Sequence, residues 1–188
     1  MGERAHDPWF DNLLARYHDR LVWFVRGLLG DEQSALDVAQ EVFVAAWRAR
    51  QQQAPPFVGE VDEAGARRWL YRVAYNRSIS LLRRRRRAGW DSLEQIASVE
   101  EERFYAPIPF EDQVAEAEAL SRALARLNPD DAVAVLLYVV HDFTAWEVAH
   151  VLDVSPAAAA KRIWRAKERL RSAYFAQQAE HMPVRGQG

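Results

Sequence analysis

The chain has 188 residues, of which 49 % are apolar and 11 % aromatic, enough for one or two domains and too many for general disorder. It contains no cysteine, which excludes disulfides, thiolate metal sites and a thiol nucleophile, and its formal net charge is only −2. No apolar run approaches about 18 residues and the start lacks the apolar core of a secretory signal, so we expect a cytoplasmic protein without a membrane span.

The charges are unevenly spread along the chain. Residues 67–87 hold nine arginines and no acid, whereas residues 91–118 hold nine acids and one arginine. Residues 161–171 are basic again, with six cations against Glu168. Two basic islands around an acidic stretch predict an anionic polymer as partner. A solvated helix face is the alternative for either island taken alone.

Apolar residues recur at helical spacing almost throughout the chain. Helices are expected over residues 9–30, 33–50, 66–87, 112–127, 130–141, 145–152 and 156–175. Residues 51–65, with two prolines and two glycines, are expected to form a loop. We therefore predict an all-α fold of two small helical domains, residues 1–90 and 112–176, with a flexible acidic linker at 91–111 and a tail at 177–188 that is frayed from residue 181.

The helix expected at 33–50 has an apolar side and a mixed polar side. Its inward positions are expected to be Leu36, Ala39, Phe43 and Ala46. The outward face combines acids with other polar groups and one valine: Asp37, Gln40, Glu41, Val44 and Arg48. Such a face is poor for binding DNA and suits protein docking. A plain solvated face is the alternative, and the pattern alone favours it.

The arginine-rich helix at 66–87 has a polar side with spacing i, i+4, i+8 and i+11, formed by Arg72, Asn76, Ser80 and Arg83. Asparagine can donate and accept at a base edge, whereas arginines mainly hold phosphates. The aromatic residues Trp69, Tyr71 and Tyr75 either stack on unpaired bases or belong to the core, and we assign Trp69 to the core. Residues 84–87 are expected to bind phosphate in a salt-dependent way. A nuclear localisation signal is the rival interpretation, without other support.

The C-terminal part carries the sharpest local pattern. Thr144 and Glu147 form a capping box that begins a helix at 145–152, and Ser155 with Pro156 begins the next helix after a two-residue turn. Two helices joined so closely predict a helix-turn-helix. The first helix is expected to bury Val148, Ala149 and Leu152. The core side of the second helix is expected to contain Ala159, Ile163, Ala166 and Leu170. The opposite side, which would enter a DNA groove, contains Ala158, Lys161, Arg162, Arg165 and Arg169. A helical hairpin with a solvated basic face is the alternative.

Nothing in the sequence predicts catalysis. The five histidines are scattered without metal-ligand spacing, and no phosphate-binding glycine loop or paired acid and base is recognisable. We therefore expect no enzyme activity, no cofactor and no metal.

Three stretches together, 37–48, 69–87 and 142–171, resemble the successive signatures of the extracytoplasmic-function (ECF) sigma factors of bacterial RNA polymerase, group IV of the primary sigma superfamily. The resemblance covers about residues 9–175, and the blocks occur in the family's order and spacing. It implies two helical domains on a flexible linker. It also implies a protein that binds core polymerase, recognises promoters and assists DNA melting in transcription initiation.

The resemblance assigns a role to each helix. Docking on the clamp of the polymerase's largest subunit would involve Asp37, Gln40, Glu41, Val44, Trp47 and Arg48. Reading of the −10 element would involve Arg72, Asn76, Arg77, Ser80, Arg83 and Arg84, with Asn76 near a flipped base and the loop 54–68 shaping its pocket. Reading of the −35 element in duplex form would involve Ser155, Ala158, Lys161, Arg162, Arg165 and Arg169.

The implied partners are RNA polymerase core, including the flap of its second-largest subunit, promoter DNA and an anti-sigma factor. The acidic residues 88–113 would follow the RNA exit path, where they can mimic nucleic acid in a basic channel. Two alternatives remain open at this point. One is a sigma-like decoy that sequesters an anti-sigma factor, and the other is a helix-turn-helix regulator that does not bind core.

The sequence departs from the family's pattern at several positions. Residues 157–160 are four alanines where the family has a Gly-Thr-Val-Lys-like run. Asp142 and Trp146 replace a glycine and an acid, and Ser80 replaces an acid. Alanine offers a base edge only apolar contact, such as with a thymine methyl. We therefore expect −35 recognition to rest on Lys161, Arg162 and Arg165 or on DNA shape.

Overall fold

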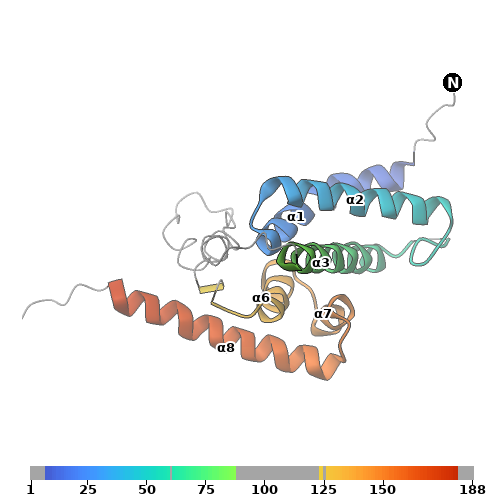
Figure 1. The fold of residues 1–188 in the computed structure, drawn as a ribbon. Helices are drawn as coiled ribbons and strands as arrows, with labels where there is room; N and C mark the ends of the chain where they lie inside the picture. The colour runs from blue at the N-terminus through green and yellow to red at the C-terminus, as the bar shows by residue number, and fades with distance from the viewer. Residues whose placement is uncertain (1–6, 60, 88–122, 125, 182–188) are drawn as a thin grey trace, which may run out of the picture.

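The computed structural model describes residues 7–59, 61–87, 123–124 and 126–181. Its elements are α1 (Pro8–Leu29), α2 (Glu32–Gln51), α3 (Glu63–Arg87), α6 (Pro129–Val135), the π-helix η1 (Leu136–Val140), α7 (Ala145–Leu152) and α8 (Pro156–His181) (Figure 1). No strand occurs in these ranges, which confirms the all-α prediction. The predicted linker 91–111, most of the helix predicted at 112–127 and the end of the tail lie outside the described residues.

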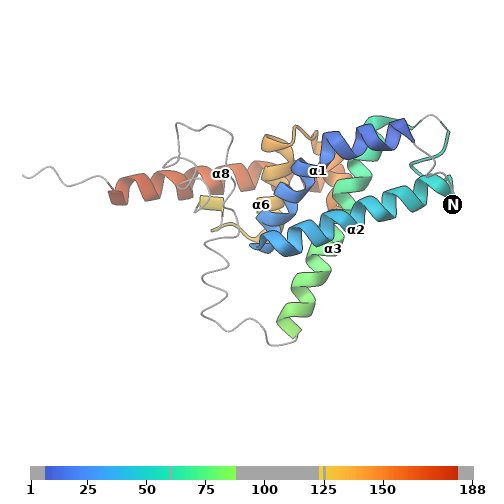
Figure 2. The same cartoon turned by 90° about the horizontal axis from the view of Figure 1, so that it is seen from above.

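The first two helices are joined tightly by local capping. Asp7 accepts a hydrogen bond from the Trp9 amide at 3.1 Å to begin α1. Gly30 ends it with φ 76°, a left-handed conformation that favours glycine. Asp31 then accepts from the Ser34 amide at 2.7 Å to begin α2. Because a short connection reverses the chain, α1 and α2 lie alongside each other, with α3 crossing beneath them (Figures 1 and 2).

The inward stripe of α2 differs from the predicted one at one position. Leu36 is 38 % exposed, so its assignment to the core is wrong. The buried stripe runs through Ala35, Val38, Ala39, Val42, Phe43 and Ala46. Since each helical residue advances by about 100°, Leu36 lies at the edge of this stripe rather than inside it. It lines a surface groove described below.

The helix-turn-helix prediction is confirmed. The Thr144 hydroxyl accepts from the Glu147 amide at 3.2 Å, and the Glu147 carboxylate accepts from the Thr144 amide at 2.8 Å. Asp153 ends α7 with φ 57°, and the Ser155 hydroxyl accepts from the Ala158 amide at 3.2 Å to begin α8. The predicted inward residues of these two helices are buried, and Leu170 is partly buried.

The segment predicted as one helix at 130–141 has two parts. After α6, the chain widens into the π-helix η1, a form often found at functional places. Three apolar side chains of η1 are exposed: Tyr138 40 %, Val139 54 % and Val140 48 %. The sequence pattern contains no signal for this change of helix type.

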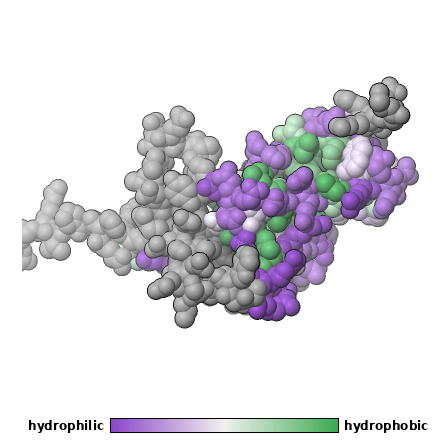
Figure 3. Space-filling view, turned by 45° about the horizontal axis from the view of Figure 1, so that its top comes forward, coloured by the Kyte–Doolittle hydropathy of each residue, from purple (hydrophilic) through white to green (hydrophobic). Residues whose placement is uncertain are grey.

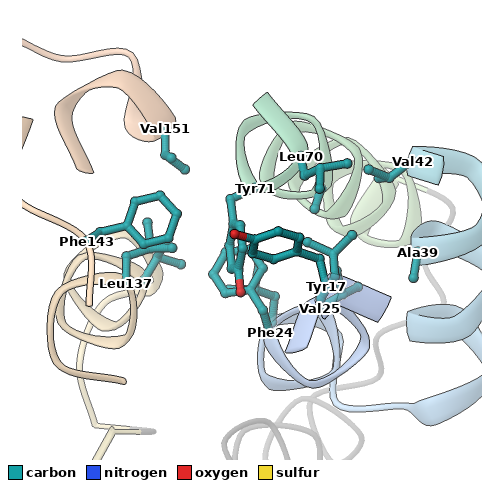
Figure 4. Close-up of a cluster of buried hydrophobic side chains, with 14 of the residues drawn as sticks. Tyr17, Phe24, Val25, Ala39, Val42, Leu70, Tyr71, Leu137, Phe143 and Val151 are labelled. Atoms are coloured by element: carbon teal, nitrogen blue, oxygen red, sulfur yellow. The ribbon is translucent and has the colours of Figure 1, made fainter. Parts of the chain in front are cut away.

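The N-terminal half (residues 7–87) and the C-terminal half (residues 123–181) share one hydrophobic core. Tyr71 of α3 lies between Phe24 of α1 and Leu137 and Phe143 of the C-terminal half (Figure 4). Tyr71 is 1 % exposed and Phe143 2 %. We call this the contact between the halves, and it determines how the sites on α3, α7 and α8 are oriented.

Candidate nucleic-acid interface

One open groove on α3 brings together four of the six residues predicted to read the −10 element. It has a volume of about 420 Å³ and is lined by Val38, Glu41, Val73, Asn76, Arg77, Ser80, Leu81 and Arg84. Asn76 and Ser80 are exposed, and neither side chain forms a hydrogen bond with another described residue. The groove therefore presents an amide, a hydroxyl and a cation to solvent, groups that suit a base edge and a phosphate.

The arginines of α3 have different surroundings. Arg77 pairs with Glu41 of α2, and Arg72 pairs with Asp153 beyond the end of α7 at 3.0 Å. Arg83 and Arg84 are exposed and form no ion pair with any described residue. These two are the cations of the arginine run that are most available to a phosphate.

Arg85 has a structural role that differs from the predicted phosphate binding. Its guanidinium donates to Asp31 at 2.9 Å and also to the Ser34 hydroxyl at the start of α2. Burial alone would raise the pKa of Asp31, but the Ser34 amide and Arg85 together hold that pKa below its ordinary value. Arg85 thus joins the end of α3 to the N-terminus of α2 and is unavailable to DNA.

The second basic surface lies on α8, where six residues were predicted to read the −35 element. Ala158, Lys161 and Arg165 are exposed, and the two cations form no ion pair with a described residue. Ser155 is occupied as the helix cap. Lys161 and Arg165 are therefore the predicted −35 cations on this face whose charges are not paired within the described residues.

Arg162 and Arg169, the other two cations of this face, are held by acids of α6. Arg162 donates to Asp130 at 3.1 Å, and Arg169 donates to Asp131. These pairs could not be predicted, because in the sequence Asp130 and Asp131 indicate only the acidic first turn of a helix. Each arginine would have to exchange a carboxylate for a phosphate to contact DNA.

A mainly apolar groove lies between α1 and α2 and includes part of the predicted docking face of α2. It has a volume of about 510 Å³ and is lined by Phe10, Leu14, His18, Leu36, Gln40, Phe43, Val44 and Trp47. Among the predicted docking residues, Gln40, Val44 and Trp47 line it, while Asp37, Glu41 and Arg48 are exposed on the same helix. Figure 3 shows apolar side chains among polar ones on this side of the molecule.

Sequence reasoning missed the contribution of α1 to this groove. Phe10 packs edge to face on Trp47 with ring centroids 4.9 Å apart, so the two helices form one surface. The available signal was Phe10, Leu14 and His18 at i, i+4 and i+8, a second stripe on a helix whose core stripe lies elsewhere. An apolar groove with a polar rim is typical of a protein-binding surface.

Two negative findings apply to the described residues. They contain no cluster of three or more histidine, aspartate or glutamate side chains that could hold a metal ion. None of their helices is both long and apolar enough to cross a membrane.

Comparisons with known proteins identify both halves. Residues 13–88 match Sigma-70 region 2, and residues 117–170 match Sigma-70, region 4. The sigma factor CnrH of Cupriavidus metallidurans is 32 % identical over 170 residues, which cover 86 % of this chain and 84 % of CnrH. The ECF sigma factor SigE of Mycolicibacterium smegmatis is 27 % identical over 90 % of this chain, which spans only 63 % of that longer protein.

A solved structure of CnrH, in complex with the cytosolic domain of CnrY, superposes with a TM-score of 0.61 at 27 % identity. The superposition covers 92 % of this chain and 91 % of that one. The paired regions define a sigma factor of the sigma-70 type. The chain belongs to the ECF sigma factors of bacterial RNA polymerase.

Proposed function

We propose that this protein binds RNA polymerase core in the cytoplasm, directs it to promoters and assists DNA melting, while the polymerase carries out all of the chemistry. The observation that carries the proposal is the adjacency of two different surfaces. Helix α2 contributes to both: Gln40 and Val44 line the apolar groove on α1 and α2, and Glu41, which pairs with Arg77, lines the open polar groove on α3. A protein that only binds DNA has no need of the first groove.

Docking on core polymerase would use the groove between α1 and α2. Val44 and Leu36, 42 % and 38 % exposed, would become buried, and Asp37, Glu41 and Arg48 would form the polar rim. The clamp of the largest subunit is the proposed partner for this surface, and the flap of the second-largest subunit is the proposed partner of the C-terminal half.

Reading of the −10 element would use the groove on α3. A flipped base could enter between Asn76 and Ser80, where an amide offers both a donor and an acceptor. Arg83 and Arg84 would hold the adjoining phosphates. Glu41 at the rim keeps Arg77 in place by an ion pair and would disfavour a phosphate at that spot.

Reading of the −35 element would use the exposed face of α8. Lys161 and Arg165 are the proposed base or phosphate contacts, and Ala158 would touch a thymine methyl or leave the groove to indirect readout.

An anti-sigma factor is the proposed antagonist. The solved structure of CnrH contains the cytosolic domain of CnrY. By analogy, we propose that a protein of this kind covers one or both docking surfaces of this chain.

Run-off transcription tests the proposal. Core polymerase would be supplied with or without this protein on fragmented host DNA, and RNA 5′ ends would be sequenced. Discrete new start sites with shared upstream motifs are expected. Binding to core without new starts would favour the decoy alternative, and absence of core binding would leave a DNA-binding regulator.

A further inference from the structure

We propose that two acids of α6, Asp130 and Asp131, limit the sequence-independent DNA affinity of the −35 surface on α8. They keep two of the four cations of that surface from binding phosphate, and so they are positioning residues that act through Arg162 and Arg169. The inference rests on the proposed function, because it concerns the surface proposed to read the −35 element.

The four cations of the −35 surface lie in two rows along α8. Lys161 and Arg165, four residues apart, form one row and are exposed, and neither pairs with a described acid. Arg162 and Arg169 form the other row, because seven residues are close to two turns of a helix. Both members of this second row are paired with acids of α6.

Arg162 lies between the two carboxylates. Its Nη1 donates to Oδ2 of Asp130 at 3.1 Å, and its Nε lies 4.0 Å from Oδ1 of Asp131. The Arg162 side chain is 29 % exposed, so water and salt screen these interactions less than they screen a fully exposed pair. Arg162 is therefore a half-buried cation whose charge is already balanced.

Asp131 is the less exposed of the two acids. Its side chain is 10 % exposed, against 47 % for Asp130. Its Oδ2 accepts from the Asn128 amide group at 2.7 Å and also from Arg169. Asn128 in turn caps α6 by accepting from the Asp131 backbone amide at 2.9 Å. The helix cap thus fixes the Asp131 carboxylate in front of Arg169.

Asp131 and a DNA phosphate would compete for Arg169, and Asp131 has the advantage. If Arg169 moved to a phosphate, the buried Asp131 carboxylate would lose the cation that is hydrogen-bonded to it. Breaking a buried ion pair is costly, whereas a contact between two solvated charges gains little. Arg169 has further N–H donors, but the pair as a whole is neutral and attracts a phosphate weakly. We therefore expect the pair to persist on DNA.

The acids stay beside α8 when the C-terminal half binds DNA. Helices α6 and α8 belong to this half, and they pack through a small core that contains Ala132, Leu136 and Ala166. Docking of α8 on duplex DNA therefore brings Asp130 and Asp131 along. The pairing with Arg162 and Arg169 needs no contribution from the N-terminal half.

The consequence is a −35 surface that binds phosphate with two cations instead of four. Phosphate contacts carry no sequence information, and each one steepens the slope of log K against log salt by about 0.9. Pairing two of the arginines would therefore lower binding to every DNA sequence by a similar factor. Less of the protein would then be held on DNA outside promoters.

The variant Asp131→Asn tests the inference, because asparagine has nearly the same shape and can still accept from Asn128. Asp130 is a less direct choice, since its carboxylate also accepts from Tyr75 of α3. Core polymerase with the unaltered or the variant chain would be titrated with two duplexes over a series of salt concentrations. One duplex carries a mapped promoter, and the other carries the same promoter with a scrambled −35 element.

The expected result is an added phosphate contact by the released Arg169. The slope of log K against log salt should steepen by about 0.9, and affinity at about 0.1 M salt should rise roughly three- to eightfold. The rise should be equal for the two duplexes. A base contact, in contrast, would favour the promoter alone.

Two further variants isolate the ion pair as the cause. The double variant Asp131→Asn, Arg169→Gln replaces the ion pair by a neutral pair, so its salt slope should equal that of the unaltered protein. This result would also show that the fold tolerates the change at Asp131. Glu32→Gln releases Arg26 outside the predicted DNA surfaces and should change neither slope nor affinity.

Three results for Asp131→Asn would each overturn the inference: an unchanged slope, a lower affinity, or a gain confined to the promoter. Equal slopes in the single and double variants would overturn it as well. If the holoenzyme with the unaltered chain binds the promoter and the scrambled duplex equally, the proposed reading of the −35 element is the part that fails.

Discussion

Asn76 differs from the surrounding arginines because its amide can both donate and accept at a base edge. Asn76→Ala should therefore reduce productive promoter binding by about 1–3 kcal/mol, or roughly 5- to 160-fold. The measurement is affinity of the holoenzyme for a single-stranded −10 oligonucleotide, together with run-off transcription. Asn12→Ala, at an exposed position of α1, is the control and should change neither.

Ala158 lies on the predicted −35 surface but has no side-chain group that could form a hydrogen bond with a base. It is exposed on the same side of α8 as Lys161 and Arg165. Ala158→Thr adds a hydroxyl and should shift the preferred −35 sequence in a selection from randomised promoters. Ala160→Thr carries the same helix propensity change on another side. An unchanged preference in the Ala158 variant would contradict the docking of this face in the groove.

Residue positions were predictable wherever they depend on local periodicity. Burial of Val148, Ala149, Ala159 and Ile163 follows from helical spacing and is confirmed. Leu36 was wrongly assigned to the core because helical spacing does not determine which of two neighbouring residues, Ala35 or Leu36, lies inside the buried stripe.

The acid partners of Arg72, Arg162 and Arg169 could not be predicted. They lie between 32 and 81 residues away along the chain. The packing of the helices brings each arginine to its acid, and the periodicity of the sequence does not reveal how the helices pack.

The arginines at the end of α3 are of two kinds: Arg83 and Arg84 form no ion pair with a described residue, whereas Arg85 is bound to Asp31 and Ser34. Arg83→Ala with Arg84→Ala should lower holoenzyme affinity and flatten the slope of log K against log salt by about 1.4–1.8, since each lost phosphate contact contributes about 0.7–0.9. Arg85→Ala should leave that slope unchanged and lower the melting temperature, because Arg85 joins α3 to Asp31 and Ser34. Equal salt slopes in both proteins would contradict this division.

The groove between α1 and α2 makes a separate prediction at this scale. Val44→Glu places a charge in an apolar, solvent-facing site, so stability should stay within about 0.5 kcal/mol. Affinity for core polymerase should fall at least tenfold because the charge would be desolvated on docking. Asn12→Asp, an exposed change of equal charge on α1, should have no such effect in a core-binding titration.

Most elements could be predicted from the sequence because their ends are encoded locally. The capping box at Thr144 and Glu147 and the cap at Ser155 are short-range signals, and all are present. The π-helix after Val135 could not be predicted, because the apolar spacing of these residues is the same as that of an ordinary helix. The groove-lining stripe of α1 was also missed, since its meaning depends on α2 lying beside it.

At the scale of the whole molecule, stability should depend on pH through His141. Burial, with the Arg20 and Arg67 charges nearby, lowers the pKa of His141 from 6.5 to about 4. Between pH 6.5 and pH 4, His141 is protonated in the unfolded chain but neutral in the folded chain. Protonation therefore favours the unfolded chain, and the stability present above pH 6.5 is lost as pH falls toward 4. The loss between pH 7 and pH 5 should be roughly 2 kcal/mol.

Chemical denaturation at a series of pH values checks this. His141→Gln should weaken the dependence of the free energy of unfolding on pH, whatever its effect on absolute stability. His150→Gln, at an exposed site, should leave that pH dependence unchanged. A parallel pH dependence in the His141 variant and the unaltered protein would contradict the assignment.

The two-domain division was predictable at this scale, since both matched regions fall on the two predicted helical units. The contact between the halves was not. Tyr71 and His141 are 70 residues apart, and base stacking was an open alternative to a core position for Tyr71. Its burial shows that the core interpretation is correct for this conformation.

The contact between the halves joins two parts of one covalent chain, and this fixes how it responds to the amount of protein. A tethered partner is present at an effective concentration on the order of millimolar, however few copies the cell contains. Raising expression would therefore increase the number of molecules whose halves are in contact without changing the fraction of molecules in contact. Only a ligand with different affinities for the two states can change that fraction. A change in the abundance of this protein alone would therefore leave that fraction as it is.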